Sequence, residues 1–195
     1  MAKINPQIIS GNWSLGVALD LHTLSSVYLG VNEFGHEIYD TTRSELGELL
    51  YRLKYRGDLS ATQEIVTTAE NYLRKNFKKF ELIVPVPPSG ARAVQPVITL
   101  AKGIASAFGT PVAECVTLTR TATALKGVID PDQRQELLAG LHAVDAKQTK
   151  GKNVLLFDDL YRSGSTLNAI ADLLKASGGV SSVQVLTITR TRSNQ

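Results

Sequence analysis

Cysteine is almost absent from this chain, which has only Cys115 among its 195 residues. A single cysteine excludes an internal disulfide and any zinc site that needs several cysteines. No apolar run approaches the roughly 18 residues that a membrane-spanning helix requires. Residues 1–10 also lack the apolar core of a secretory signal. These absences predict a cytoplasmic protein without a membrane partner.

A strong charge bias and the common nucleotide-binding glycine motifs are also missing. The formal net charge is only +3, which is typical of cations scattered over a solvated surface and gives little reason to expect nucleic acid as a partner. Neither Gly-x-Gly-x-x-Gly after a first strand nor a Walker Gly-Lys-Ser/Thr loop occurs. We therefore exclude the dinucleotide-binding and P-loop folds.

Hydrophobic residues make up 43% of the chain, an ordinary share for a protein that buries a core. The most informative pattern among them is at residues 154–166, Val-Leu-Leu-Phe-Asp-Asp-Leu-Tyr-Arg-Ser-Gly-Ser-Thr. Its first four residues are apolar and predict a strand buried on both faces, as in a parallel sheet. Asp158 and Asp159 follow where that strand is expected to end, and a pattern of helical period begins after Thr166.

The residue types in this stretch suit a phosphorylated sugar. Ligands of open parallel sheets bind beyond the carboxyl ends of the strands. The backbone amides of residues 163–166 can converge on a phosphate at the helix N-terminus, and Gly164 permits a positive φ. Asp158 and Asp159 can accept from sugar hydroxyls or hold a magnesium ion that accompanies phosphates. A plain helix cap is the alternative, but it explains one polar side chain and not two acids with a glycine loop.

Apolar periodicity predicts the remaining elements. Residues 15–21, 26–31 and 36–39 predict a small antiparallel meander. A helix with an apolar stripe of leucines follows, and the cations of its last turn are interpreted as complementing the helix C-terminus. A capping box at residues 60–63 predicts the start of the next helix. His22 and His36 are isolated histidines, to which we assign no role.

A second strand–loop–helix unit begins at residue 82. Its strand, residues 82–86, leads into a loop that is rigid at its prolines and permissive at its glycine. The helix of this unit is expected to end at Gly109. Residues 119–131 form a longer segment with little apolar periodicity, which in a compact domain is usually functional or disordered. A helix with its apolar stripe on one side follows residue 166, and residues 183–189 predict a last strand beside the strand of residues 154–157.

The stretch at residues 154–166 resembles the phosphoribosyltransferase signature of four hydrophobic residues, an acidic pair and a loop ending in hydroxyl-Gly-x-Thr. The resemblance implies a site for phosphoribosyl pyrophosphate in which the acids hold the ribose and the loop holds the 5-phosphate. The implied substrate-binding residues are Asp158, Asp159, Tyr161, Arg162, Ser163, Gly164, Ser165 and Thr166. Arg162 departs from the family pattern, which usually has a small residue there.

The same resemblance assigns the other loops. The loop after the first core strand would bind pyrophosphate, with Pro88, Ser89, Gly90, Ala91 and Arg92 as candidates. The later segment would be the mobile loop that closes over the reaction, with Arg120, Lys126 and Arg134 as the cations that meet pyrophosphate. The family uses Mg²⁺, so Mg²⁺ is the expected cofactor, bound with the substrate and through Asp158 and Asp159.

Several shorter motifs resemble the ComF-like branch of this family. They are Leu-Lys-Tyr-Arg-Gly-Asp at residues 53–58, Pro-Val-Pro at 85–87, Arg120, Arg134, Gly140 and Asp-Asp-Leu-Tyr at 158–161. The chain lacks the cysteine-rich zinc module that often precedes this branch. It also has Lys126 where a glutamine is usual and Leu137 where an asparagine is usual.

We therefore expect an α/β fold with a mainly parallel central sheet flanked by helices and a small N-terminal hood of hairpin and helices. Residues 1–80 would form the hood and residues 81–195 the core. The expected activity is magnesium-dependent transfer of ribose 5-phosphate from phosphoribosyl pyrophosphate to a nitrogen acceptor. The alternatives are a non-catalytic binder of sugar phosphates or nucleotides and a ComF-like accessory protein of DNA uptake. Expected partners are phosphoribosyl pyrophosphate or a nucleoside monophosphate, and a second copy of the chain in a homodimer.

Overall fold

The computed structural model describes residues 1–88, 90, 95–119 and 140–192. Ser89, Ala91, Arg92, Arg120, Lys126 and Arg134, six of the predicted site residues, lie outside the described residues. Among the described residues, no helix is both long enough and apolar enough to cross a bilayer.

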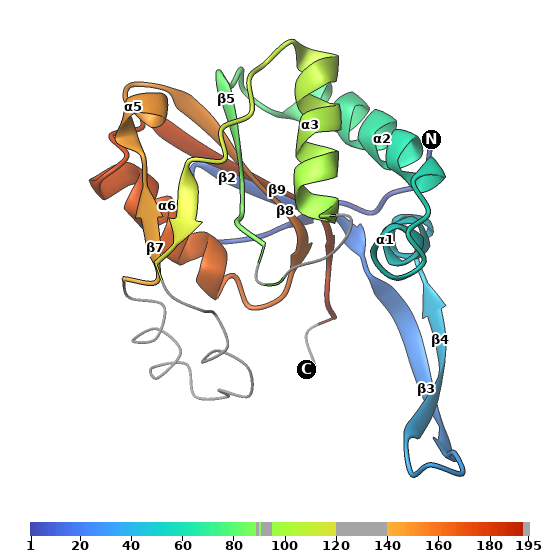
Figure 1. Cartoon of the computed structure of the whole chain (residues 1–195). Helices are drawn as coiled ribbons and strands as arrows, with labels where there is room; N and C mark the ends of the chain where they lie inside the picture. Colours follow the sequence, from blue (N-terminus) through green and yellow to red (C-terminus); the bar gives the residue numbers. More distant parts are fainter. Residues whose placement is uncertain (89, 91–94, 120–139, 193–195) are drawn as a thin grey trace.

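A five-stranded sheet forms the centre of the molecule, in the order β1-β2-β9-β8-β5 (Figure 1). The bounds are Gln7–Ile8 for β1, Leu15–Leu21 for β2, Ser182–Arg190 for β9, Asn153–Tyr161 for β8 and Leu82–Pro85 for β5. The strands β2, β9, β8 and β5 run parallel, and only the edge strand β1 is antiparallel. The expected α/β fold with a mainly parallel sheet is confirmed.

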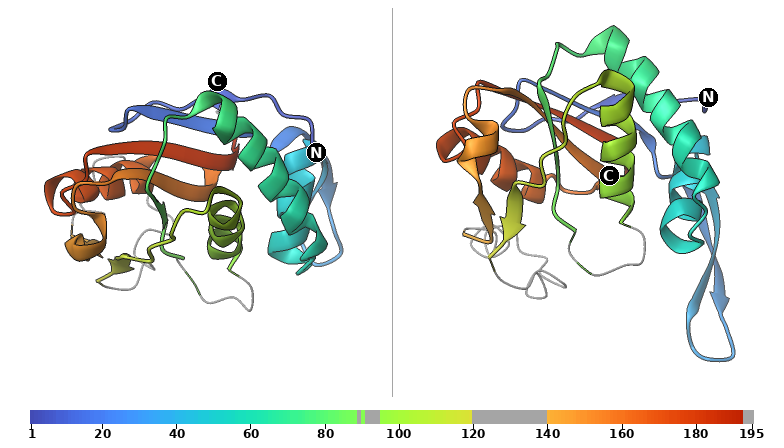
Figure 2. Two further views of the ribbon diagram at one scale, coloured as in Figure 1. Left: turned by 90° about the horizontal axis from the view of Figure 1, so that it is seen from above. Right: turned by 45° about the horizontal axis from the view of Figure 1, so that its top comes forward.

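Helices cover both faces of this sheet (Figures 1 and 2). One face packs against α1 (Glu45–Tyr55), α2 (Ser60–Asn76) and α3 (Pro96–Phe108), and the other packs against α6 (Ser165–Ala176). A two-stranded antiparallel sheet of β6 (Val116–Leu118) and β7 (His142–Val144) borders the α6 side, and the short α5 (Ala146–Thr149) follows β7.

The strand β8 shows why the motif strand needs an unbroken apolar run. Leu155 and Phe157 pack with α1, α2 and α3, whereas Val154 and Leu156 pack with α6, and all four side chains are fully buried. Because successive side chains of a strand point to opposite faces, a strand covered on both faces requires apolar residues at every position. The helices on either side thus hold the end of β8 in a fixed place.

The hairpin of β3 (Thr23–Val31) and β4 (Glu37–Arg43) projects from the body (Figure 1). The predicted antiparallel meander was wrong about residues 15–21, because β2 pairs in parallel with β9 rather than with β3. The burial explains the difference: residues 16–20 are all buried, as in a parallel sheet, while residues 24–29 are all exposed. The 1–80 and 81–195 division stays a prediction, although β1 and β2 lie in the central sheet.

The entry to α1 is tied to the end of β2. The Ser44 hydroxyl accepts a hydrogen bond from the Gly47 amide at 2.9 Å and donates one to the Leu21 carbonyl at 2.6 Å. Gly47 is required there, since a Cβ at this position would lie 2.1 Å from the His22 carbonyl oxygen. These contacts place the first turn of α1 against the carboxyl end of β2.

The other helix ends show one success and one error of prediction. The predicted capping box at residues 60–63 was wrong, because α2 begins at Ser60 and the Asp58 carboxylate accepts from the Ser60 amide at 2.9 Å. The end of α3 is as predicted: Gly109 adopts the left-handed conformation that terminates the helix, with φ of 60°.

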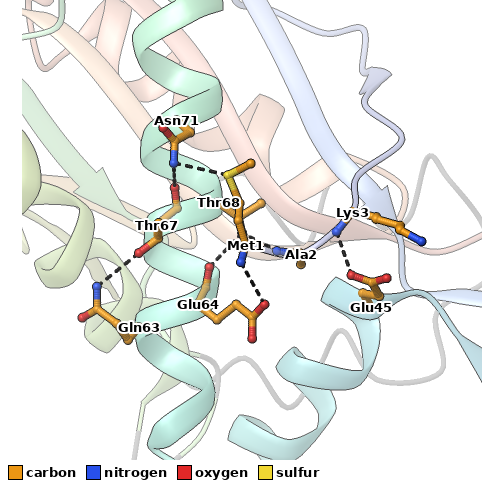
Figure 3. Close-up of polar contacts among 9 residues, drawn as sticks. All are labelled: Met1, Ala2, Lys3, Glu45, Gln63, Glu64, Thr67, Thr68 and Asn71. Atoms are coloured by element: carbon orange, nitrogen blue, oxygen red, sulfur yellow. Dashed lines mark hydrogen bonds and ion pairs between the residues drawn. The ribbon is translucent and has the colours of Figure 1, made fainter.

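The first residues of the chain bridge α1 and α2 (Figure 3). The Ala2 amide donates to Thr68 at 3.1 Å, and the Lys3 amide donates to the Glu45 carboxylate at 2.8 Å. The Met1 ammonium lies 3.3 Å from Glu64. Ala2 is buried, so this segment completes the helical layer beside the sheet.

We expect Gly47→Ala to lower the free energy of unfolding by about 2 kcal/mol, as other overpacked sites do. The added methyl group meets a backbone carbonyl, which cannot rotate away. Gly103→Ala in α3 is the matched control, because its Cβ would meet only a methyl group of Val66, at 2.6 Å. Urea unfolding of both variants tests this, and equal stability of the two would contradict it.

Candidate functional site

The predicted site residues lie at one edge of the sheet. The parallel strands β2, β9, β8 and β5 all end there, at Leu21, Arg190, Tyr161 and Pro85. This is the edge at which ligands bind in open parallel sheets. Residues 158–166 lie at this edge, so the structure brings the predicted acids and the predicted phosphate loop together.

The two acids lie inside β8 rather than after it. The prediction that the strand ends before Asp158 was wrong, because pairing with β9 continues from Asp158, opposite Thr187, to Tyr161, opposite Arg190. Side chains alternate along a strand, so the two carboxylates leave β8 on opposite faces. Asp158 lies on the α6 face and Asp159 on the α1 face.

The pKa of the Asp158 carboxyl is raised into the neutral pH range. Burial, together with the charge of Asp159, raises this pKa to about 7, although hydrogen bonds from the Asp159 and Leu160 amides and the charge of Lys54 act in the opposite direction. The Asp159 amide donates to Asp158 at 2.8 Å. The carboxyl of Asp158 is therefore held at the end of the strand and can both donate and accept hydrogen bonds near pH 7.

Asp159 is paired with a lysine from α1. The Lys54 ammonium lies 2.6 Å from the Asp159 carboxylate, and the two side chains are only 12% and 13% exposed. Our sequence interpretation missed this role, because it took the last cations of the helix only as complementing the helix C-terminus. A signal was available: Lys54 follows Leu46 and Leu50 at intervals of four, and both leucines are buried.

His22 is a second residue that sequence reasoning left without a role. It follows β2 directly, its ring nitrogen Nδ1 lies 3.1 Å from the Thr189 hydroxyl, and its amide donates to Arg190 at 2.7 Å. Burial, together with the charges of Lys54 and Arg43, lowers the pKa of His22 to about 4. The imidazole is therefore neutral at pH 7 and adds no charge beside the acids.

The phosphate loop has the features that an anion site needs. Gly164 is left-handed, with φ of 78°, and a Cβ there would lie 2.7 Å from the Tyr161 hydroxyl oxygen. The N-cap residue Gly164 has no side chain to cap α6, and no acid occupies the first turn. The Ser165 amide donates to the Ser163 hydroxyl only at the long distance of 3.5 Å, so the amides at this N-terminus can turn to an anion. The Ser163 and Ser165 hydroxyls lie 2.9 Å apart beside them. Arg162 is exposed.

The predicted pyrophosphate loop is described only in part. Pro88 and Gly90 follow β5, and the Gln95 side chain donates to the Gly90 carbonyl at 2.9 Å. A shallow cavity of about 270 Å³ lies beside this loop. Its lining residues are Pro85, Pro87, Pro88, Ile98, Glu114, Val116, Thr117 and Leu118. The cavity is mainly apolar, and its lining includes neither Asp158 nor Asp159. It is therefore a neighbour of the acid site and not part of it.

The described residues contain no group of three or more His, Cys, Asp or Glu side chains that could hold a metal ion. The oxygen donors at the strand end are of the kind that Mg²⁺ prefers, and Mg²⁺ commonly binds through one or two carboxylates plus the phosphates of a substrate. Asp158 and Asp159 fit that mode, in which the ion arrives with the ligand.

Comparison with solved structures identifies the fold. The chain is 20% identical to a structure described as the allosteric regulatory enzyme of purine biosynthesis, with a TM-score of 0.52, covering 80% of this chain and 34% of that one. It is 17% identical to glutamine phosphoribosylpyrophosphate amidotransferase from B. subtilis, with the same TM-score of 0.52 and the same coverage of 80% and 34%. It thus spans about a third of the length of these two proteins.

A third structure is close to this chain in length. Orotate phosphoribosyltransferase from Aeropyrum pernix is 16% identical, with a TM-score of 0.50, covering 87% of this chain and 76% of that one. No protein-family model matches the chain, and no curated protein matches it either. At this level of identity the similarity defines the fold, which is that of the type I phosphoribosyltransferases. The likeness to a ComF branch stays a prediction from the short motifs.

Replacing Asp158 should change how stability depends on pH. A raised pKa means that the folded state binds the proton more tightly, so the stability from protonated Asp158 is complete below pH 4 and is lost as the pH rises through 7. The asparagine of Asp158→Asn cannot ionise, so the free energy of unfolding of this variant should fall less between pH 4 and pH 8. At pH 8 the variant should be more stable than the parent by about 2–4 kcal/mol. Urea unfolding over a pH series measures the difference.

The control for that experiment is Asp145→Asn. Hydrogen bonds from Gln148 and the Lys147 amide lower the pKa of Asp145, so its contribution has the opposite sign. It is present at neutral pH and lost as the pH falls. If Asp158→Asn proved less stable than the parent at pH 8, the assignment of a charge-intolerant site to Asp158 would be wrong.

Lys54→Met should destabilise the protein more than Arg52→Met, which lies on the same helix. Lys54 neutralises a mostly buried carboxylate, and removing one partner of such a pair costs about 3–5 kcal/mol. Arg52 pairs with Asp58 at side-chain exposures of 36% and 28%, and a pair of that kind is worth about 1 kcal/mol or less. Chemical denaturation at pH 8 compares the two, and similar losses would contradict the prediction.

Proposed function

We propose that this protein is a magnesium-dependent phosphoribosyltransferase. It binds phosphoribosyl pyrophosphate and transfers ribose 5-phosphate to a nitrogen acceptor, with loss of pyrophosphate. One observation carries the proposal: two carboxylates leave the end of a central strand beside a helix N-terminus whose N-cap residue is Gly164, at the carboxyl edge of a phosphoribosyltransferase fold. The shared fold supports this reaction class without naming the acceptor.

The roles follow from the positions. Asp158 and Asp159 would accept hydrogen bonds from the ribose hydroxyls, and the first turn of α6 with the hydroxyls of Ser163, Ser165 and Thr166 would hold the 5-phosphate. Gly164 would let the phosphate approach the backbone. Tyr161 lies against Gly164 and so would support the loop. Exposed Arg162 would add a positive charge near the phosphate.

In the reaction a nitrogen of the acceptor attacks the anomeric carbon as the bond to pyrophosphate breaks. Bound Mg²⁺ would neutralise pyrophosphate charge. The chain would contribute mainly positioning and charge stabilisation, through the two acids and the phosphate loop. The proposal also includes two predicted groups of contacts to pyrophosphate. They are the loop of residues 88–92 and the cations of the predicted mobile loop, Arg120, Lys126 and Arg134.

Lys54 adds a feature to this site. Its ammonium balances Asp159 when no substrate is present, so a ribose hydroxyl or a magnesium ion that reaches Asp159 must share or displace the ion pair. The same acids and phosphate loop also suit a second candidate, a non-catalytic binder that recognises phosphoribosyl pyrophosphate or a nucleoside monophosphate. In that case the acids would bind the sugar without turnover.

Titration calorimetry with phosphoribosyl pyrophosphate and Mg²⁺, followed by a pyrophosphate-release assay with a panel of nucleobases and amines, separates the two candidates. Binding with release on one acceptor supports the transferase. Binding without release on any acceptor supports the binder, and no binding at all contradicts both.

The double variant Asp158→Asn with Asp159→Asn should lose at least 100-fold in affinity, about 2.7 kcal/mol, because both acceptors for ribose lose their charge. Far-ultraviolet circular dichroism at pH 8 should remain that of the parent, because the stability gained with Asp158→Asn offsets most of the stability lost with the Lys54–Asp159 ion pair. The charge-matched control is Glu33→Gln with Asp40→Asn, two exposed acids of the hairpin, which should bind like the parent. Unchanged affinity in the double variant would refute the assignment of these acids.

A further inference from the structure

Arg43 is the last residue of β4 and lies at the carboxyl edge of the central sheet. It is opposite Thr23, the residue that follows His22 at the end of β2. The next residue, Ser44, donates a hydrogen bond to the Leu21 carbonyl at 2.6 Å. These two connections hold the end of β4 against the end of β2, where the hairpin joins the body (Figure 1). Arg43 is therefore fixed at the rim of the candidate site.

The Arg43 side chain is stacked on an aromatic ring of α1. Its guanidinium carbon lies 3.8 Å from the centroid of the Tyr51 ring. Lys54 follows Tyr51 by three residues, so the two side chains lie on the same side of the helix. Lys54 contacts the Asp159 carboxylate at 2.6 Å. The stack therefore places the guanidinium on the side of α1 that faces the acid site.

Most hydrogen-bond donors of Arg43 are not used within the part of the chain that the structure describes. There its side chain makes one hydrogen bond, from a terminal nitrogen to the Glu48 carboxylate at 3.3 Å. The Glu48 side chain is 42% exposed, and a pair of that kind contributes little. A guanidinium has five N–H donors in a planar fork that matches a carboxylate. Tyr51 thus keeps in place a fork that can still bind an anion.

Positive charge predominates on this side of the site. Besides burial, the charges of Lys54 and Arg43 lower the pKa of His22, and the charge of Arg162 acts in the same direction. The charge of Asp159 acts in the opposite direction. Lys54 balances that acid, and the half-exposed partner acid of Arg43 balances one arginine. A net positive charge therefore remains beside the neutral imidazole.

The chemistry of ribose places the acceptor on this same side. The anomeric carbon and the carbon that leads to the 5-phosphate lie on opposite sides of the ring oxygen, so the reacting carbon points away from the phosphate loop. That loop is at the N-terminus of α6, whereas Asp159 leaves β8 toward α1. A ribose bound between them would present its anomeric carbon toward α1 and the end of β2, where Arg43 lies.

We propose that the nitrogen acceptor is an aromatic heterocycle that carries a carboxylate, and that Arg43 binds this carboxylate. The inference rests on the proposed transferase and specifies its substrate class. A planar guanidinium binds a carboxylate through two parallel hydrogen bonds. The carboxylate of an aromatic acid is conjugated with its ring, so this contact also orients the ring and its nitrogen. A neutral acceptor that covered Arg43 would leave the guanidinium without a partner, which costs affinity.

Arg43 would act as a specificity residue and would not take part in bond making. The ring nitrogen gives its lone pair to the anomeric carbon, and pyrophosphate leaves with the electrons of the broken bond. A pyridine-type nitrogen has no proton to lose, and an N–H nitrogen releases its proton to water. The carboxylate stays ionised on Arg43 throughout, so the contact contributes mainly to binding the acceptor.

Matched pairs of acceptors test the role of charge in the unmodified protein. Nicotinate differs from nicotinamide by one carboxylate, and orotate differs from uracil in the same way. With phosphoribosyl pyrophosphate and Mg²⁺, pyrophosphate release should have a kcat/KM at least about 10-fold higher for the acid than for its neutral partner in one of these pairs. Release that is equal or faster with the neutral partners overturns the inference and leaves the transferase standing.

The variant Arg43→Met should remove this preference. We expect kcat/KM to fall about 10-fold or more for the acid, mainly through KM, and to stay unchanged for the neutral partner, while Arg43→Lys restores part of the loss. The matched control is Arg74→Met, because Arg74 lies 4.5 Å from the centroid of the Phe108 ring and pairs with Glu70, away from the acid site. It should keep the preference of the parent. An equal loss for both members of a pair in Arg43→Met would indicate a purely structural role and overturn the inference.

A binding measurement separates failure of this inference from failure of the transferase. Titration calorimetry adds nicotinate or orotate to the full chain saturated with ribose 5-phosphate and Mg²⁺, under which no turnover occurs. Binding of an acid that is weakened about 10-fold or more in Arg43→Met supports the anion site, even where pyrophosphate release with every acceptor fails and contradicts the transferase. If neither acid binds, or if Arg43→Met binds it as tightly as the parent, the assignment of Arg43 is wrong.

Discussion

The fold depends on the burial of β8 between two neighbouring strands and two layers of helices. A strand covered on every side accepts polar residues only where its cover ends, which in β8 is at residues 158–161. The acids therefore lie where the cover of this strand becomes incomplete, beyond its four fully buried residues. Burial at the same place raises the pKa of Asp158, and it makes Asp159 dependent on the Lys54 ammonium. Site and core are thus consequences of the same arrangement.

Much of this could be predicted from the chain because the signals were local. The apolar run before Asp158, the loop at Gly164 and the helix end at Gly109 each follow from a few consecutive residues. The misses concern partners far away in the sequence. β2 is an apolar segment whose pairing with β9 spans more than half the chain, and no local rule distinguishes that pairing from a hairpin.

The residues missed at the site have the same explanation. Lys54 meets Asp159 across a separation of 105 residues, and His22 meets Thr189 across 167. Only the packing of α1 and β2 against the sheet brings them together. The helical spacing of Lys54 behind two buried leucines pointed inward, but it did not say which acid it would meet. The continuation of β8 through both acids was likewise set by β9, whose length the motif does not encode.

The attachment of the hairpin of β3 and β4 to the body has a consequence for the site. Its two strands leave the body directly after His22 and return directly before Ser44, and these two residues hold the rim of the acid site and the first turn of α1. A movement of this hairpin would therefore act on the site at two points. One is the His22 imidazole, and the other is α1, whose far end carries Lys54, the counter-ion of Asp159.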